Sequence, residues 1–139
     1  MTAEDHRSFA AEVVEFIETG YTPDFTVIGF HLGEGDPEHG GEHWNFTQTI
    51  PPENDGNFEG VCTVKEIQQV TVYGGIERFS MWPNRLVCEF DEATAPKAGV
   101  KKLEISYAID PEKWRKLSEI AMRVFDGESC FELHHQTKP

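Results

Sequence analysis

The stretch VYGGIERFSMWPNRLVCEF, residues 72–90, decides how the rest of the chain is interpreted. It contains two runs of strand-forming residues, 76–82 and 85–90. Between the two runs stand Pro83 and Asn84, which are residue types favoured in tight turns. The stretch therefore predicts a β-hairpin, and the fold must hold an antiparallel strand pair here.

A pair of glycines stands just before this hairpin. Gly74 and Gly75 separate the β-branched run that ends near Val72 from the one that begins at Ile76. Glycine adopts positive φ angles at no steric cost, so the pair can turn or bulge the chain. We expect Gly74 and Gly75 to form a structural turn that prevents one over-long strand.

Alternating apolar residues predict further strands on both sides of the hairpin. In residues 25–32, for example, Ile28, Phe30 and Leu32 share one face. The other candidate strands are residues 44–50, 61–64, 69–73 and 103–109.

An N-terminal helix is expected within residues 1–20. Phe9, Val13, Phe16 and Ile17 recur at the spacing of one helix face. These large apolar side chains are costly to leave in water, so we expect the helix to pack on the sheet.

A second helix is expected near the C-terminus. Asp110 and Pro111 offer an N-cap followed by proline at the first helical position, and apolar residues then recur at helical spacing up to Gly127. The tail, residues 128–139, has two interpretations. Residues 130–133 suit an edge strand, and the remainder suits a flexible end.

Strands bunched between two terminal helices predict an α+β fold. We expect a single, mainly antiparallel sheet of five to seven strands, with both helices packed against it. The chain has 139 residues, which fits one domain spanning residues 1–139.

The net charge is strongly negative, with 25 acidic against 12 basic residues and a formal charge of −13. Such a surface repels nucleic-acid phosphates and anionic membranes, so neither is an expected partner. A basic protein would be attracted. The same charge could serve solubility alone, and that alternative stays open.

Several features predict a cytoplasmic protein. No apolar run approaches the roughly 18–20 residues that cross a bilayer. The N-terminus is acidic and amphipathic, unlike a secretory signal. The three cysteines are widely spaced, which is typical of reduced thiols.

No catalytic or metal-binding constellation stands out. His39 and His43 lie in an acidic, glycine-rich loop, but Gly40 and Gly41 oppose the helix that would align the two rings. The loop also lacks the ligand spacing of a calcium hand. We therefore expect no metal, no cofactor and no catalytic residues.

The run from Tyr73 to Phe125 carries an ordered set of elements. They are YGGIERF (73–79), RLVCEFD (85–91), LEISYAID (103–110) and WRKLSEIAMRVF (114–125). In this order they resemble a family of bacterial polymorphic-toxin immunity proteins, immunity family ten. The segments WNFTQTI and DGNFEGVCTVKEIQQVTV, further upstream, are similar to the family more loosely.

The resemblance implies a function without catalysis. Such a protein binds and neutralises a cognate toxin domain, typically the C-terminal domain of a secreted effector. Two other classes stay open. One is an acidic secretion adaptor or chaperone for an effector, and the other is a small metal-dependent hydrolase. The oligomeric state is not predicted.

If the toxin has a basic groove, acidic loops are the natural contact surface, and an exposed tryptophan is the natural anchor. Solvated loop charge is the alternative for the acidic residues. The candidate partner-binding residues are Glu34, Asp36, Glu38 and Glu42 in the first loop, Glu53 and Asp55 in the second, and Trp82 at the hairpin tip.

Overall fold

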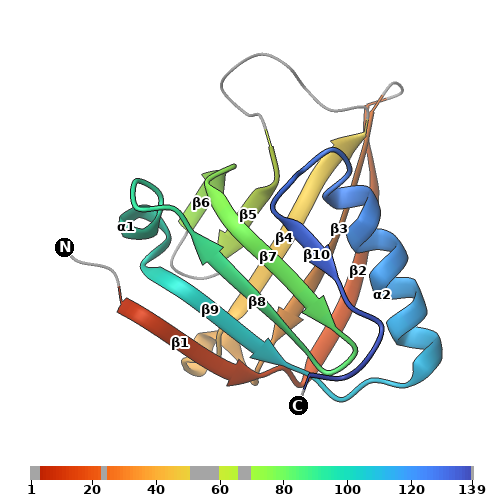
Figure 1. Ribbon diagram of the computed structural model, residues 1–139, viewed down its shortest axis with the longest axis horizontal. Coiled ribbons are helices and arrows are strands. Elements are labelled where there is room, and N and C mark those ends of the chain that lie inside the picture. The colour runs from red at the N-terminus through yellow and green to blue at the C-terminus, as the bar shows by residue number, and fades with distance from the viewer. Residues whose placement is uncertain (1–3, 23–24, 51–59, 66–69, 139) are drawn as a thin grey trace.

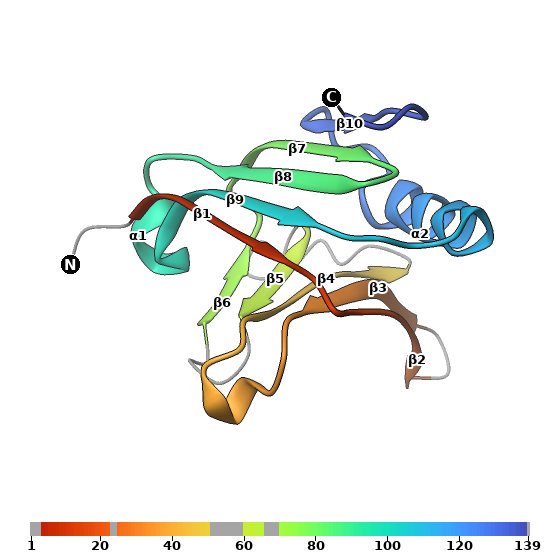
Figure 2. The same ribbon diagram turned by 90° about the horizontal axis from the view of Figure 1, so that it is seen from below.

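The structure is a computed structural model that describes residues 4–22, 25–50, 60–65 and 70–138. Two five-stranded sheets lie one above the other and enclose a shared apolar core (Figures 1 and 2). At the centre of the core, the fully buried ring of Phe79 belongs to one sheet and contacts Phe30 and Phe46 of the other, with ring centroids 6.2 and 5.0 Å away.

The first sheet has the strand order β1-β9-β8-β7-β10. β9, β8 and β7 pair antiparallel, whereas the edge strands β1 and β10 pair parallel to β9 and β7. The bounds are β1 (Glu4–Ala10), β7 (Ile76–Trp82), β8 (Arg85–Phe90), β9 (Val100–Ser106) and β10 (Phe131–Leu133).

The second sheet has the order β2-β3-β4-β5-β6, and each strand pairs antiparallel with the next. Ile28, Phe30 and Leu32 of β3 are buried, because they face the core. The bounds are β2 (Val13–Thr22), β3 (Phe25–Gly33), β4 (His43–Ile50), β5 (Cys62–Lys65) and β6 (Val70–Tyr73).

One long helix, α2 (Pro111–Val124), packs against β3 and β4 beside the first sheet (Figure 1). The Asp110 side chain caps it by accepting from the backbone N–H of Lys113 at 2.7 Å. Two short helical segments, η1 (Pro37–His39) and α1 (Ala95–Ala98), lie in loops. Within the described ranges, no helix is long and apolar enough to cross a membrane.

The predicted single sheet with two terminal helices is wrong. The described residues form two sheets of five strands, and residues 4–20, which were expected to form a helix, belong to β1, β2 and the link between them. Local strand patterns cannot reveal this division, because they do not say which strands pair. The pairing of β1 with β9, for instance, joins Glu4 to Val100 across most of the chain.

The expected N-terminal helix is replaced by β1 and β2 (Figure 1). Val14 and Phe16 of β2 pair with Leu32 and Phe30 of β3, so side chains alternate between the two faces. Within this segment, only β2 is rich in β-branched residues, which favour strands. The helix-like spacing of the segment arises because the chain passes from one sheet to the other near Ala11, shifting the apolar phase.

The hairpin prediction is confirmed. β7 and β8 pair antiparallel up to Trp82 and Arg85, with Pro83 and Asn84 in the turn. The expected C-terminal helix is confirmed as α2. The strands expected before and after the hairpin are present as β3, β4, β5, β6 and β9.

The glycine pair lies where the chain crosses from the second sheet to the first, between β6 and β7. Gly74 and Gly75 have φ angles of 68° and 75°, a region that side-chain-bearing residues rarely occupy. A Cβ on Gly75 would lie 2.0 Å from Oγ1 of Thr94. Both the backbone conformation and the packing therefore require glycine at position 75.

Candidate functional site

The loop between β3 and β4 carries most of the acidic candidates and is organised by its own backbone. The N–H of Glu34 donates to the carbonyl of Glu42 at 2.9 Å. The N–H groups of His39 and Gly41 both donate to the Asp36 carbonyl at 3.0 Å. These bonds fold the loop around η1, in which Asp36 and Glu38 are exposed and Glu34 is half-buried.

Asp36 is the centre of this loop. Its carboxylate accepts from the backbone N–H of Glu38 at 2.9 Å and contacts Nδ1 of His39 at 2.7 Å. The hydrogen bond from the Glu38 backbone has the larger effect and the one with His39 the smaller, and together they hold the pKa of Asp36 below its usual range. Asp36 therefore stays ionised at neutral and mildly acidic pH.

Two groups hold the loop at Gly35. The Gly35 N–H donates to Oε2 of Glu12 at 2.9 Å, and the Gly35 carbonyl lies 2.9 Å from Nε2 of His43. Nδ1 of His43 in turn lies 2.7 Å from Nε2 of His31, whose Nδ1 contacts the Asn45 side chain. We call the set Glu12, His31, His43 and Asn45 the histidine clamp.

The strands explain how the clamp assembles. His31 on β3 is directly opposite Asn45 on β4, and Gly33 is opposite His43. His31, His43 and Asn45 therefore share the face of the second sheet that points away from the core. The His43 ring lies over Gly33, where a Cβ would come within 2.1 Å of Nδ1. Glycine at position 33 leaves the space that the ring fills.

Beside the clamp, the loop forms an open recess of about 300 Å³. Gly41 borders it, and a Cβ there would lie 1.9 Å from the Glu34 carbonyl oxygen. Glu34, Asp36 and Glu38 form no ion pair with a lysine or arginine in the part of the chain that the structure describes. The acidic recess is lined by Glu12, Glu34, Gly35, Asp36, His39, Gly40 and Gly41.

Glu42 has a different position from the other predicted loop residues. Its Oε1 lies 3.0 Å from an Arg7 guanidinium nitrogen, 3.3 Å from Nε1 of Trp44 and 3.6 Å from Nζ of Lys65. The side chain is 17% exposed. Because Arg7 lies on β1 and Lys65 on β5, Glu42 joins the two sheets and is neutralised there.

The other candidates do not join the recess. Glu53 and Asp55 lie outside the described residues. The Trp82 indole is half-buried and stacked on the His134 ring, with centroids 4.6 Å apart. The Lys138 ammonium lies 4.7 Å from the same indole. The C-terminal segment thus covers the tryptophan that was expected to be an open anchor.

A second open recess, of about 340 Å³, lies on the outer face of the first sheet. Its charged groups are Arg85 and Glu104, which form an ion pair at 2.8 Å. Ser8 and Ser106 also contribute to its lining. Because its two charges neutralise each other, this recess attracts neither cations nor anions strongly.

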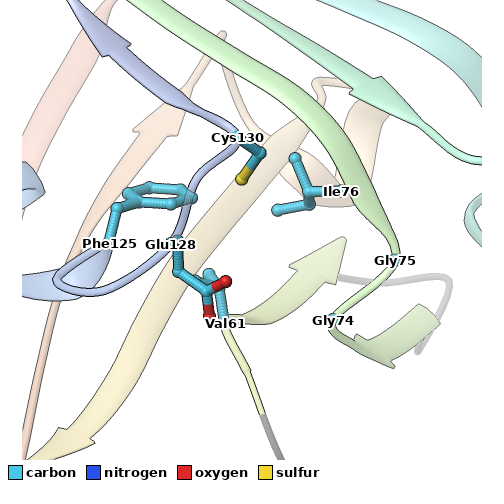
Figure 3. Close-up of a pocket in the computed structure, with 7 residues that line it drawn as sticks. All are labelled: Val61, Gly74, Gly75, Ile76, Phe125, Glu128 and Cys130. Atoms are coloured by element: carbon cyan, nitrogen blue, oxygen red, sulfur yellow. The ribbon is translucent and has the colours of Figure 1, made fainter.

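A small pocket of about 40 Å³ lies beside the glycine pair (Figure 3). The sulfur of Cys130 points into it, and the Glu128 carboxylate lies at its border. Burial raises the pKa of the Cys130 thiol, and the negative charge of Glu128 raises this pKa further by a smaller amount. A protonated thiol is a poor nucleophile, and the volume suits little more than one water molecule.

In the described ranges, no three His, Cys, Asp or Glu side chains are grouped so that they could hold a metal ion. No protein-family model matches the chain, and neither a curated protein nor a solved structure matches it significantly.

Sequence reasoning missed Glu12 and the histidine clamp. Side chains alternate along β4, so His43 and Asn45 lie on one face of the strand and Trp44 and Phe46 on the other. This alternation is visible in the sequence. Their contact with His31 depends on the register of β3 against β4. Glu12 reaches the loop only because the chain changes sheets next to it, which no local pattern shows.

Proposed function

We propose that this protein is a non-catalytic immunity protein that binds and neutralises a basic toxin domain through the acidic recess. One observation carries the proposal. The loop holds Glu34, Asp36 and Glu38 together, with a lowered pKa at Asp36, and pairs none of them with a lysine or arginine among the described residues.

Apart from the contact of Asp36 with His39, no ion pair in the described part of the chain accounts for these carboxylates, so ion pairing within the fold does not explain the arrangement. It creates a local negative potential that attracts a cationic surface and speeds its association. A recess of about 300 Å³ also has room for more than one lysine or arginine side chain.

The resemblance to immunity family ten supports the class of function. The segments that carry it form β7, β8, β9 and α2, which contribute the central core contacts. The acidic recess lies outside those segments. This division fits a protein whose frame belongs to a family and whose contact loop is matched to one particular partner.

The test begins with capture of partners from the source cells, using the wild-type protein and the E34Q/D36N variant at low and high salt. We expect the wild type to retain one folded basic domain from the C-terminus of a secreted protein, and the variant to retain less of it. Expression of that domain alone should inhibit growth, and co-expression of the wild type should restore growth.

A matched control is the E92Q/D126N variant, which removes two exposed carboxylates from other loops. It should capture and protect as the wild type does. Capture of unfolded effector segments by a dimer of this protein would instead indicate a secretion adaptor. A captured domain that inhibits growth equally with and without this protein would contradict the proposal.

A further inference from the structure

The acidic recess is held in shape by a contact between two imidazoles. The His31 and His43 rings lie with centroids 4.9 Å apart, and Nε2 of His31 is 2.7 Å from Nδ1 of His43. A hydrogen bond at this distance needs a proton on one of the two nitrogens and a lone pair on the other. The contact therefore depends on how many protons the pair carries.

The heavy-atom positions define which protonation states fit. His43 Nε2 must carry a proton to donate to the Gly35 carbonyl, which leaves Nδ1 of His43 as the acceptor from His31. An additional proton on Nδ1 of His31 leaves the contact between the two rings unchanged, because Nε2 of His31 still donates. Neutral and singly protonated pairs therefore both fit without any movement of the rings.

A doubly protonated pair does not fit. It would place an N–H of His31 against an N–H of His43 at 2.7 Å, with two positive charges in contact. The rings would have to separate. Because His43 also holds the Gly35 carbonyl, their separation would release the loop at the point where it is fastened to the sheet.

From this geometry we propose that the histidine clamp makes the acidic recess sensitive to protons. The recess is formed while the two imidazoles together carry at most one positive charge. It is released when both imidazoles are charged. The test therefore covers pH 7.5 to 5.5, which lies in the range where histidine side chains in general change their charge.

The charged groups around the clamp favour this behaviour. Glu15 on β2 is opposite His31, Glu12 accepts from Gly35, and Asp36 interacts electrostatically with His43. Glu34 and His39 line the recess beside them. On the side of β5, Asn45 faces the uncharged Val64. These carboxylates could pair with each ring once the two have separated.

The carboxylate of Asp36 should stay ionised over this range. Hydrogen bonds from Glu38 and His39 hold the pKa of Asp36 below its usual value, so the charge of Asp36 persists while the histidines titrate. A change between pH 7.5 and 5.5 would therefore report on the histidines. The geometry of the recess would be lost while Asp36 remained ionised.

The test measures hydrogen exchange of the Gly35 amide by NMR, corrected at each pH for the exchange rate of an unstructured peptide. Below the transition, we expect the equilibrium constant for opening of the wild-type loop to rise about tenfold for each unit by which the pH falls. This slope is the one expected when opening takes up one proton. Backbone amides of the buried strand β3 should keep their protection over the same range.

Two variants make the test specific. In His31→Gln, the amide can donate to neutral His43 or, after turning over, accept from charged His43, so protection should hardly change with pH. In His43→Asn, the donor to Gly35 is lost, so protection should be low at every pH. His135→Gln removes an exposed histidine of the C-terminal segment and should behave as the wild type.

Wild-type protection of Gly35 that stays constant from pH 7.5 to 5.5 would overturn the proposal, as would a transition that persists unchanged in His31→Gln. These measurements use the isolated protein and do not depend on the proposed function. The regulation of partner binding does rest on it. If partner binding is regulated in this way, the wild type should release the captured basic domain at pH 5.5, and the His31→Gln variant should retain it.

Discussion

Two carboxylates of the loop between β3 and β4, one at the end of the loop and one at its tip, have opposite surroundings. At its end, Glu42 is 17% exposed and contacts Arg7 and Lys65 from strands of both sheets. At its tip, Asp36 is 53% exposed and is held by the backbone and by His39. The same residue class thus stabilises the junction between the sheets at the end of the loop and forms an exposed acidic surface, without a lysine or arginine, at its tip.

The difference shows how to separate structural from functional charge in an acidic protein. A carboxylate that gathers cations from distant strands contributes to the fold. A carboxylate that is placed by its own loop, without a cation, leaves its charge for another molecule. Substitutions at the junction should therefore reduce the stability of the protein, and substitutions in the recess should reduce partner binding.

The largest expected effect on stability is that of Glu42→Gln. The substitution removes the carboxylate that Arg7 and the largely buried Lys65 share, which should lower the free energy of unfolding by about 3 kcal/mol. Urea denaturation would measure the change. The control is Glu38→Gln in the same loop, which should change stability by less than about 0.5 kcal/mol. Equal losses of stability in the two variants would contradict the distinction between the structural carboxylate and the carboxylates of the loop surface.

Gly75→Ala tests the other connection between the sheets. The positive φ and the overlap with Thr94 should together cost about 2 kcal/mol. Gly127→Ala is the matched control, because Gly127 also has a positive φ, of 80°, but has open space around it. If thermal or urea unfolding shows the same loss for both variants, packing at the crossing contributes nothing.

Tyr107→Phe should have a smaller effect. The Tyr107 hydroxyl contacts the carbonyls of Trp82 and Arg85 at 2.6 and 3.0 Å, so its removal should cost about 1 kcal/mol. Burial also raises the pKa of Tyr107.

The stability from neutral Tyr107 is present below the ordinary tyrosine pKa of about 10 and is lost as the pH rises further. Urea midpoints measured from pH 8 to pH 11 would check this. The difference between wild type and Tyr107→Phe should shrink at alkaline pH, and a difference that stays constant would contradict the assignment.

Much of the local structure could be predicted from the sequence. The β7–β8 hairpin depends on the turn chemistry of Pro83 and Asn84, and α2 depends on its Asp110 cap and apolar period. Both signals lie within a few residues. The division into two sheets depends on which strands pair, as in the parallel contact of β1 with β9, and no local pattern contains that information.

The candidate site was predictable to the same extent. Composition alone identifies the acidic loop with Glu34, Asp36 and Glu38. It could not show that Glu42 is neutralised, because Arg7 and Lys65 reach it from other strands. Nor could it show that the C-terminal segment covers Trp82. In each case the missing information is a tertiary contact between residues far apart in the chain.

The most direct test of the account is the affinity of the captured basic domain for three proteins, measured at low and high salt. The E34Q/D36N variant should bind at least about tenfold more weakly than the wild type at low salt, mainly through slower association, and should show a weaker salt dependence. E92Q/D126N should match the wild type. Equal weakening by both variants would show that net charge, and not the acidic recess, attracts the partner.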